Sequence, residues 1–524
     1  MLWVALLGCL AVAGAVLALV ASPWWWFAGG PLTALLVLAV WDLVQRRHSV
    51  LRNYPVLGHL RFALEGIRPE MQQYFVERNV DGRPFDRDTR SIVYERAKGT
   101  DAEEPFGTEQ DLYATGSEFL VPSMAPHPVR TDVPRVRVGG PGCKQPYDMA
   151  LLNVSAMSFG SLSSNAILAL NSGAALGGFA HDTGEGGLSE YHLRPGGDLV
   201  WEIGTGYFGC RTDQGGFDPA MFADKAAHEQ VRCVSLKLSQ GAKPGIGGVL
   251  PGTKVNAEIA QVRGVPQGRT IISPPYHQVF STPRELVAFV ARMRELSGGK
   301  PTGFKLCIGS RSQFLAVCKA MLDEGVTPDF IIVDGAEGGT GAAPLEFADN
   351  LGMPLTDGLT TVHQALVGTG LRDRIKIGAS GKVATGSDLV KRLLQGADYT
   401  NAARAMMFAV GCIQAQRCHT NTCPTGVTTQ DPRRARALDV GDKSRRVQRF
   451  QEATVKSALQ IMASMGVDEP SDLAPHMLRR RIDSVTVRSY AELYPPLAPG
   501  ELIHQAPEFW AADWKAADPD RFTV

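Results

Sequence analysis

Residues 302–335 read TGFKLCIGSRSQFLAVCKAMLDEGVTPDFIIVDG: an apolar run, a segment with helical spacing, and a second apolar run. Short apolar runs bounded by turn residues are typical of buried strands. Strand, helix and strand in this order form the unit from which parallel sheets are built. The stretch therefore predicts an α/β protein, and its recurrence along the chain decides the architecture.

The same alternation recurs on both sides of this stretch. We expect eight strands, at residues 150–157, 177–183, 206–211, 233–239, 302–309, 329–335, 375–380 and 397–403. Eight strands that alternate with helices predict a (β/α)8 TIM barrel. We expect the barrel to occupy residues 130–430, after an irregular polar lead-in over 49–129 and before a helical extension over 431–524.

Composition excludes some classes of function. The chain has 524 residues, with 53 Lys and Arg against 53 Asp and Glu. This balance gives no reason to expect nucleic acid as a partner. The nine cysteines are odd in number and irregularly spaced outside residues 412–423, which argues against a secreted disulfide framework. We therefore expect a reducing compartment.

The first 48 residues differ in composition from the rest. Residues 1–20 carry no charged side chain and are long enough to cross a bilayer as a helix. A second apolar stretch, residues 24–44, begins with three tryptophans and is followed by the basic residues Arg46 and Arg47. This pattern predicts a two-helix anchor over residues 1–48, in the cell (inner) membrane with the catalytic domain on the cytoplasmic side. The alternatives are a cleaved signal peptide, whose basic start is missing here, and one span with an interfacial helix.

Glycine-rich loops follow the expected strands: MSFGSLS, DTGEGG, SQGAKPGIGG, DGAEGGTGAAP and ASGKVATG. In barrels the loops at the carboxyl ends of the strands carry the chemistry, and phosphate binds after strands seven and eight. Gly381 and Lys382 follow the seventh expected strand, and Ala403 and Arg404 follow the eighth. The loops indicate a phosphate site, but glycine also serves ordinary turns.

Lys237 lies in SLKLS, where it alternates with apolar residues on an expected barrel strand. A buried lysine needs an anionic partner. A lysine at the end of a strand can instead extend to solvent. The pattern leaves both explanations open.

Cys412, Cys418 and Cys423 are spaced C-x5-C-x4-C, with Pro424 directly after the last. Three thiolates suit an iron–sulfur cluster, and a Cys-Pro ending occurs in bacterial ferredoxin segments. Zinc sites usually have four ligands in CxxC-type pairs, and only His419 is near enough to complete a set. Three buried free cysteines are the third explanation.

Residues 411–432, GCIQAQRCHTNTCPTGVTTQDP, resemble the iron–sulfur segment of the synthase domain of glutamate synthase. Further motifs resemble that domain in the same order: SAMSFGSLS (155–163), TGEGG (183–187), QGAKPG (240–245), LPG (250–252), ISPP (272–275), GGTGAAP (338–344) and LRDR (371–374). The resemblance runs from about residue 130 to about residue 465. It is closest to the stand-alone FMN-binding glutamate synthase family proteins, and it implies a barrel that binds FMN and a [3Fe-4S] cluster.

The resemblance also implies a role for each matching residue. The implied cluster ligands are Cys412, Cys418 and Cys423. The implied FMN-binding residues are Ala156, Met157, Ser158, Lys237, Ser380, Gly381, Lys382, Ala403 and Arg404. The implied 2-oxoglutarate-binding residues are Gln240, Lys243 and Arg263, and the implied catalytic residues are Lys237, Glu185 and Lys243. The implied reaction is hydride transfer from reduced FMN to 2-iminoglutarate, which gives L-glutamate.

Two substitutions depart from the family pattern KPGEGGQLPG, which reads KPGIGGVLPG here. Ile246 replaces an acid, and Val249 replaces an amide that helps to hold 2-oxoglutarate. Loss of a polar ligand weakens the binding of a polar substrate. The sequence also shows no glutaminase domain and no NAD(P)H-binding domain. We therefore expect ammonia from solution or a separate subunit, and electrons from ferredoxin or a membrane electron carrier.

With the predicted anchor, the resemblance implies a membrane-anchored FMN and iron–sulfur oxidoreductase that acts on CH–NH2 donors and makes glutamate by reductive amination. One alternative is a dehydrogenase with the same cofactors that acts on a different 2-oxo acid or amino acid, which Ile246 and Val249 favour. The other is a non-catalytic electron-transfer subunit. Lys243 and Arg263 speak against it, because an electron relay needs no carboxylate clamp.

Overall fold

The computed structural model describes residues 2–100, 103 and 105–522. The chain divides between Arg83 and Pro84 into two compact units, and each is described by itself.

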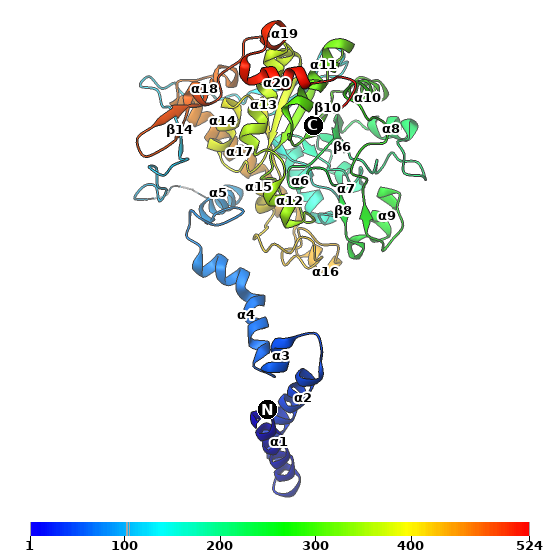
Figure 1. Cartoon of the computed structure of the whole chain (residues 1–524), viewed down its shortest axis with the longest axis vertical. Coiled ribbons are helices and arrows are strands. Elements are labelled where there is room, and N and C mark those ends of the chain that lie inside the picture. Colours follow the sequence, from blue (N-terminus) through cyan, green and yellow to red (C-terminus); the bar gives the residue numbers. More distant parts are fainter. Residues whose placement is uncertain (1, 101–102, 104, 523–524) are drawn as a thin grey trace. The chain divides into compact units, whose positions relative to one another are not determined.

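A closed barrel of eight parallel strands forms the centre of the second unit (Figure 1). In chain order its strands are β4 (Leu152–Val154), β5 (His181–Asp182), β6 (Leu199–Ile203), β7 (Val231–Lys237), β10 (Thr302–Leu306), β11 (Phe330–Asp334), β12 (Lys376–Ser380) and β13 (Tyr399–Ala402). Each strand pairs with the next along the chain, and β13 closes the barrel on β4. The predicted (β/α)8 fold is confirmed.

The third barrel strand is β6, so the prediction of a strand at residues 206–211 is wrong. All five residues of β6, LVWEI, are buried. Residues 206–211 form a turn in which the Cys210 amide donates to the Tyr207 carbonyl (2.9 Å) and Gly209 has a φ of 87°. GYFGCR is apolar enough for a strand, but a glycine free to adopt positive φ lets the chain reverse there.

Helices alternate with the barrel strands. They are α6 (Ser164–Gly177), α7 (Glu190–Leu193), α8 (Pro219–Ala226), α9 (Ala257–Arg263), α10 (Pro283–Leu296), α11 (Arg311–Glu324), α12 (Leu345–Asn350), α13 (Leu355–Gly368), α14 (Gly386–Leu394) and α15 (Arg404–Ala409). Capping boxes fix three of their starts: Ser189 begins α7 with His192, Thr282 begins α10 with Glu285, and Thr385 begins α14 with Asp388.

The barrel interior is apolar towards the amino ends of its strands and polar towards their carboxyl ends. Val200, Cys233, Ile332 and Tyr399 belong to a small apolar cluster that is separate from the main core. The antiparallel pair β2 (Arg135–Val138) and β3 (Tyr147–Ala150) adds Val138 and Met149 to this cluster. Nearer the carboxyl ends, strand residues that share the inward face are polar, and they underlie the candidate site.

The region after the barrel is helical, with one small sheet. It contains α16 (Pro432–Arg436), α17 (Val440–Ser464), α18 (Tyr490–Leu493), α19 (Glu501–Gln505) and α20 (Glu508–Ala516). Helix α17 packs against α6 and against α5 (Arg87–Lys98). The sheet joins β1 (Glu118–Leu120), β14 (Leu478–Arg481) and β15 (Val487–Ser489). The limits predicted for the lead-in and the extension stay predictions.

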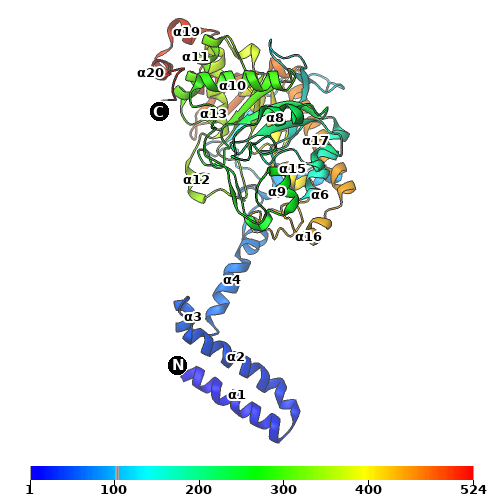
Figure 2. The ribbon, with the colours of Figure 1, turned by 90° about the vertical axis from the view of Figure 1, so that its right-hand side faces the viewer.

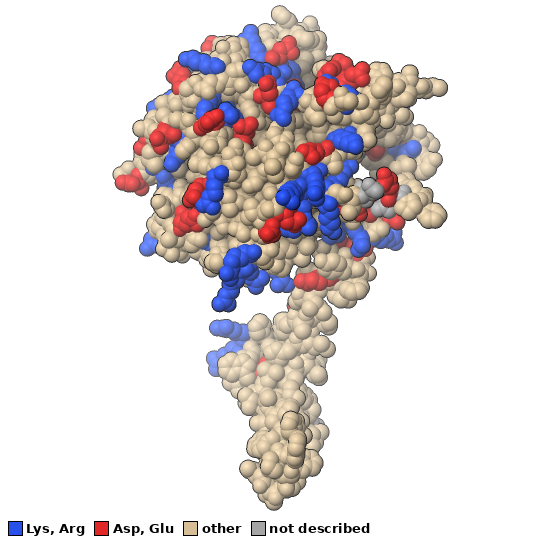
Figure 3. Space-filling model, turned by 180° about the vertical axis from the view of Figure 1, so that it is seen from behind, with Lys and Arg blue, Asp and Glu red and all other residues tan. Residues whose placement is uncertain are grey.

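The first unit begins with a helical hairpin, α1 (Leu2–Val20) and α2 (Trp26–Val44), whose helices run side by side (Figure 2). They approach closely at two glycines: a Cβ on Gly14 would lie 2.9 Å from the Gly29 Cα. Both helices are long and apolar enough to cross a membrane, a test that a signal sequence also passes. Charged side chains are sparse over the hairpin face seen in Figure 3. Two helices follow, α3 (Ser49–Asn53) and α4 (Gly58–Met71).

Candidate active site

Lys237 is the last residue of β7, and it meets an anion inside the protein. Its Nζ lies 3.3 Å from Glu185 Oε2 and donates to Gln240 Oε1 at 3.1 Å. The Lys237 and Glu185 side chains are only 11% and 15% exposed. The buried explanation for Lys237 therefore holds, and three of the predicted site residues come together at the carboxyl end of the barrel.

Two further cations act on Glu185. Burial raises the pKa of Glu185, but the positive charges of Lys237, Arg263 and Lys243 outweigh burial, and the net effect lowers it. Burial in turn lowers the pKa of Lys243, and it lowers that of Arg263 to about 10. Lys243 Nζ donates to the Gly247 carbonyl (2.7 Å). The arrangement is a buried carboxylate that stays ionised because three cations surround it.

Glycine backbone encloses the Glu185 carboxylate. A Cβ on Gly248 would lie 1.9 Å from Glu185 Oε1, and a Cβ on Gly204 would lie 2.5 Å from Oε2. The loop that carries Ile246 and Val249 therefore passes directly against Glu185. Any side chain at residue 204 or 248 would displace the carboxylate.

Arg263 ends α9 and reaches back to the loop after β4. Its Nη2 donates to the Phe159 carbonyl (3.0 Å) and to Ser158 Oγ (3.3 Å), and its guanidinium lies over the Phe208 ring. Its buried Nε has no hydrogen-bond partner among the described residues. A buried donor without a partner is costly, and a bound anion would satisfy it.

A layer of buried charge lies on the inward face of the barrel strands. Lys305 of β10 forms an ion pair with Glu202 of β6, and both side chains are almost fully buried. Burial and the nearby Glu202 charge raise the pKa of Asp182, at the end of β5, to about 8. Asp182 Oδ1 also accepts from the Gly184 amide (3.0 Å), which fixes the start of the loop that carries Glu185.

His277 supports the Lys237 backbone. Its Nε2 lies 2.9 Å from the Lys237 carbonyl and its Nδ1 lies 3.0 Å from Tyr207 Oη. Burial lowers the pKa of His277 to about 4, so the ring is neutral. Because a carbonyl only accepts, Nε2 carries the proton and Nδ1 accepts from the Tyr207 hydroxyl.

Apart from Lys237 on β7, the residues predicted to bind FMN lie at the ends of β4, β12 and β13. Ala156, Met157 and Ser158 form the loop after β4, and a Cβ on Gly184 would touch the Ser158 amide at 2.7 Å. Ser380 Oγ lies 3.2 Å from Ser155 Oγ, which joins the ends of β12 and β4. Gly381 and Lys382 follow β12, and Lys382 has a φ of 52°.

Arg404 follows β13, the eighth strand, after Ala403. Its Nη2 donates to the Glu337 carbonyl (2.5 Å), and its guanidinium lies over the Phe85 ring. Burial lowers the pKa of Arg404, and it forms no ion pair within the described part of the chain. The charges of Asp334 and Glu337 act on Arg404 and partly offset the effect of burial. A buried cation at this position suits the phosphate of FMN.

The three cysteines of residues 412–423 lie close enough to affect one another electrostatically. Burial, together with the nearby Cys418 and Cys423 charges, raises the pKa of Cys412 to about 12. For Cys423, hydrogen bonds from Thr425 and Thr428 outweigh burial and lower the pKa to about 7. No group of three or more His, Cys, Asp or Glu among residues 2–100, 103 and 105–522 is placed to hold one metal ion. A cluster takes its thiolates at different irons, so this donor set fits a cluster better than zinc.

Comparison with known proteins identifies the family to which this chain belongs. Residues 145–468 match the family model described as the conserved region in glutamate synthase. The glutamate synthase large subunit-like protein YerD of Bacillus subtilis is 36% identical over 502 residues, which cover 87% of this chain and 95% of that protein. The chain belongs to the glutamate synthase family. It is therefore an oxidoreductase of the glutamate synthase type.

Other family members share a smaller part of the chain. The archaeal glutamate synthase [NADPH] of Methanocaldococcus jannaschii is 33% identical over 330 residues, 63% of this chain and 61% of that protein. The glutamate synthase [NADPH] large chain of Bacillus subtilis is 35% identical over 285 residues, which are 18% of its length. This chain thus spans about three-fifths of the archaeal relative and a small part of the large chain.

Lys254 joins the cysteine segment of this family member to the barrel. Its Nζ donates to three carbonyls, those of Ser161 (3.2 Å), Cys418 (2.7 Å) and Thr428 (2.9 Å). The side chain is buried, and burial lowers its pKa to about 8. An ammonium has three donors, so every one is used.

The motifs of the family did not point to several of these residues. Lys305 follows the same alternation in GFKLC that singled out Lys237 in SLKLS, so that signal was available. Glu202 was hidden because the third strand was placed at 206–211. Lys254 and His277 bond to backbone carbonyls of distant segments, and sequence spacing carries no signal for such contacts.

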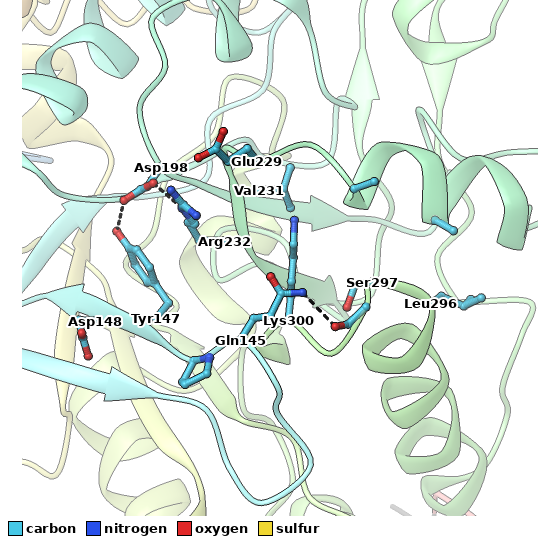
Figure 4. Close-up of a pocket in the computed structure, with 14 residues that line it drawn as sticks. Gln145, Tyr147, Asp148, Asp198, Glu229, Val231, Arg232, Leu296, Ser297 and Lys300 are labelled. Carbon is cyan, nitrogen blue, oxygen red and sulfur yellow. Dashed lines mark hydrogen bonds and ion pairs between the residues drawn. The ribbon is translucent and has the colours of Figure 1, made fainter.

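Two pockets lie at opposite ends of the barrel. One, of about 760 Å³, is lined by Asp198, Arg232 and Lys300 at the amino ends of β6, β7 and β10 (Figure 4). Chemistry in barrels lies at the other end, so this pocket is outside the candidate site. The other, of about 400 Å³, lies beside the site at the carboxyl ends of β7 and β10 and includes Ser239 and Cys307.

Proposed function

We propose that this chain is a membrane-anchored FMN and iron–sulfur enzyme that makes L-glutamate from 2-oxoglutarate by reductive amination. Ammonia comes from solution or from a separate subunit, and electrons come from ferredoxin or a membrane carrier. The names of two family members, a glutamate synthase large subunit-like protein and an archaeal glutamate synthase [NADPH], support this reaction.

The proposal rests on the net positive charge of the candidate site. Lys237, Lys243 and Arg263 supply three positive charges around the single negative charge of Glu185. Three minus one leaves a net charge of plus two. A dicarboxylate such as 2-oxoglutarate carries two negative charges, and it would neutralise a buried site that otherwise holds excess charge.

Each residue has a distinct task in this proposal. Arg263, with its unpartnered Nε, binds one substrate carboxylate, and Lys243 binds the other. Glu185 accepts a proton from, or returns it to, the substrate nitrogen, because its carboxylate is the buried base at the site. Gln240 orients the Lys237 ammonium. FMN, when bound, supplies the hydride that reduces the imine carbon.

Other residues would hold the cofactors. The loop Ala156–Met157–Ser158 would contact the flavin ring, with Lys237 at the same end of the barrel. Ser380, Gly381, Lys382, Ala403 and Arg404 would hold its phosphate, the buried Arg404 by charge. Cys412, Cys418 and Cys423 would ligate the [3Fe-4S] cluster, which passes electrons to the flavin.

A second function uses the same cofactors on another substrate. Ile246 and Val249 lie half-buried in the loop that touches Glu185. An apolar pair at this place favours a substrate with an apolar group. The enzyme would either reductively aminate such a 2-oxo acid or, as a dehydrogenase, oxidise the corresponding amino acid and pass two electrons to the flavin. A relay without substrate would leave the excess positive charge of the site unexplained.

An anaerobic single-turnover measurement tests the proposal. The flavin of the full-length protein is reduced by light, and 2-oxoglutarate with ammonium is added while its absorbance is followed. Reoxidation with formation of glutamate supports reductive amination. No reoxidation, with flavin and iron both bound, would reject 2-oxoglutarate, and a panel of amino acids tested as reductants of the oxidised flavin then tests the dehydrogenase.

Lys243→Ala tests the carboxylate site. We expect turnover to be lost while the flavin stays bound. Lys456→Ala, at an exposed lysine of α17, is the matched control and leaves turnover unchanged. Turnover that survives in Lys243→Ala would show that Lys243 does not bind the substrate.

A further inference from the structure

Helix α4 carries an apolar face that is open to solvent. Leu60, Leu64, Ile67 and Met71 are three or four residues apart, so they share one face. Phe75 continues this face in the π-helical turn Gln72–Val76. The five side chains are between 46% and 78% exposed.

One flank of this apolar face is charged. Arg61 pairs with Glu65 one turn later (2.8 Å), and Arg68 lies one further turn along. An apolar stripe of this length on a soluble surface is rare and marks a contact with another apolar phase or molecule. A strong apolar face beside arginines is typical of helices that lie in a membrane surface.

The start of α4 is fixed to the end of the apolar hairpin. Asp42, in the last turn of α2, accepts from the Val56 amide (2.8 Å), and its carboxylate lies 2.9 Å from His59 Nε2. Asp42 is fully buried by these contacts. The apolar face of α4 therefore begins at the same end of α2 as Arg46 and Arg47, where a membrane-spanning helix meets the lipid headgroups.

We propose that α4 lies in the membrane surface, with Leu60, Leu64, Ile67, Met71 and Phe75 in the acyl boundary. Arg61 and Arg68 lie at the level of the lipid phosphates. The inference rests on the proposed membrane anchor, and it adds a second contact with the same bilayer. It makes the anchor a hairpin with an attached surface helix, which restrains the direction in which the chain leaves the membrane.

Photo-cross-linking of the full-length protein tests this contact. The protein is reconstituted in vesicles of phosphatidylcholine and phosphatidylglycerol, with p-benzoylphenylalanine in place of Ile67 or of Leu64. We expect lipid adducts by mass spectrometry at both positions. The matched control places the same probe at Gly66, on the side of the helix away from the apolar face, where a side chain has open space and where we expect the lipid adduct to be lost.

A probe at Val37 separates this inference from the anchor itself. Val37 is 65% exposed in the middle of α2. Lipid adducts at Val37 but not at Ile67 or Leu64 would overturn the surface helix and leave the anchor intact. No lipid adduct at any position would overturn both. Adducts from Ile67 to residues 84–524, or to a second chain, would show that protein covers this face and would also overturn the inference.

Discussion

Replacement of Lys254 by methionine tests how the cysteine segment is held. Methionine has a similar length and fills the space, but it leaves the carbonyls of Ser161, Cys418 and Thr428 without their donor. A hydrogen bond to a charged group contributes about 2 kcal/mol, so the three together stabilise the fold by about 6 kcal/mol. The cost of burying the charged Lys254 ammonium opposes this stabilisation.

The opposing cost follows from the pKa of Lys254. Burial lowers this pKa from 10.5 to about 8. A difference of this size corresponds to about 3 kcal/mol, because one pKa unit equals about 1.4 kcal/mol. Because the hydrogen-bond value already includes part of this desolvation cost, the net loss of stability expected for Lys254→Met lies between about 3 and about 6 kcal/mol.

Denaturant unfolding, followed by circular dichroism, measures this loss in the full-length protein. Bound iron per flavin is measured on the same samples, and we expect it to fall. Lys319→Met is the matched control, because Lys319 donates to the carbonyls of Trp514 (2.6 Å) and Ala517 (2.9 Å), far along the chain from the cysteines. It should lower stability and keep iron. Unchanged stability in Lys254→Met, or equal iron retention in both variants, would refute the reasoning.

Three further predictions concern the barrel. Lys305→Met should cost about 3–5 kcal/mol of stability, because it leaves Glu202 buried and unpaired, and adding Glu202→Gln should recover most of it in denaturant unfolding. Asp182 keeps its proton in the fold up to about pH 8 but loses it from about pH 4 when unfolded, so stability falls as pH rises through this window. The slope of up to about 1.4 kcal/mol per pH unit should vanish in Asp182→Asn, and a slope that persists contradicts the assignment. Arg404→Leu should weaken FMN binding roughly ten- to hundredfold in flavin-retention measurements, and equal retention would remove Arg404 from the phosphate site.

The sequence predicts the barrel because each buried strand is a short apolar run bounded by turn residues. This logic failed at one strand, where two apolar runs lie next to each other. LVWEI enters the sheet, and the neighbouring GYFGCR forms a turn. LVWEI is the more apolar of the two runs and contains no glycine, whereas GYFGCR contains two glycines and ends in arginine, so hydropathy and glycine content both mark LVWEI as the strand.

The sequence predicts those site residues that belong to a recognisable motif at the end of a strand. It does not predict those residues that meet only because the barrel brings distant strands together. Lys237 comes from SLKLS, Gln240 from QGAKPG and Glu185 from TGEGG, and they meet because all three segments lie at the carboxyl end of one barrel. Glu202 and Lys305 meet across the barrel through strand register, which the sequence analysis did not resolve. The membrane anchor and the residue roles stay predictions.

One loop connects the substrate site with the cysteine segment. Its four successive carbonyls, residues 159–162, accept from three side chains of different segments: Arg263, Gln430 and Lys254. Arg263 belongs to the proposed carboxylate site, while Gln430 and Lys254 bind the segment that carries the cysteines. A loop held at every carbonyl moves only if all three partners move with it. A change in the Arg263 position on substrate binding would therefore shift Lys254 and, through it, Cys418. For the same reason, Lys254→Met should weaken substrate affinity as well as iron retention.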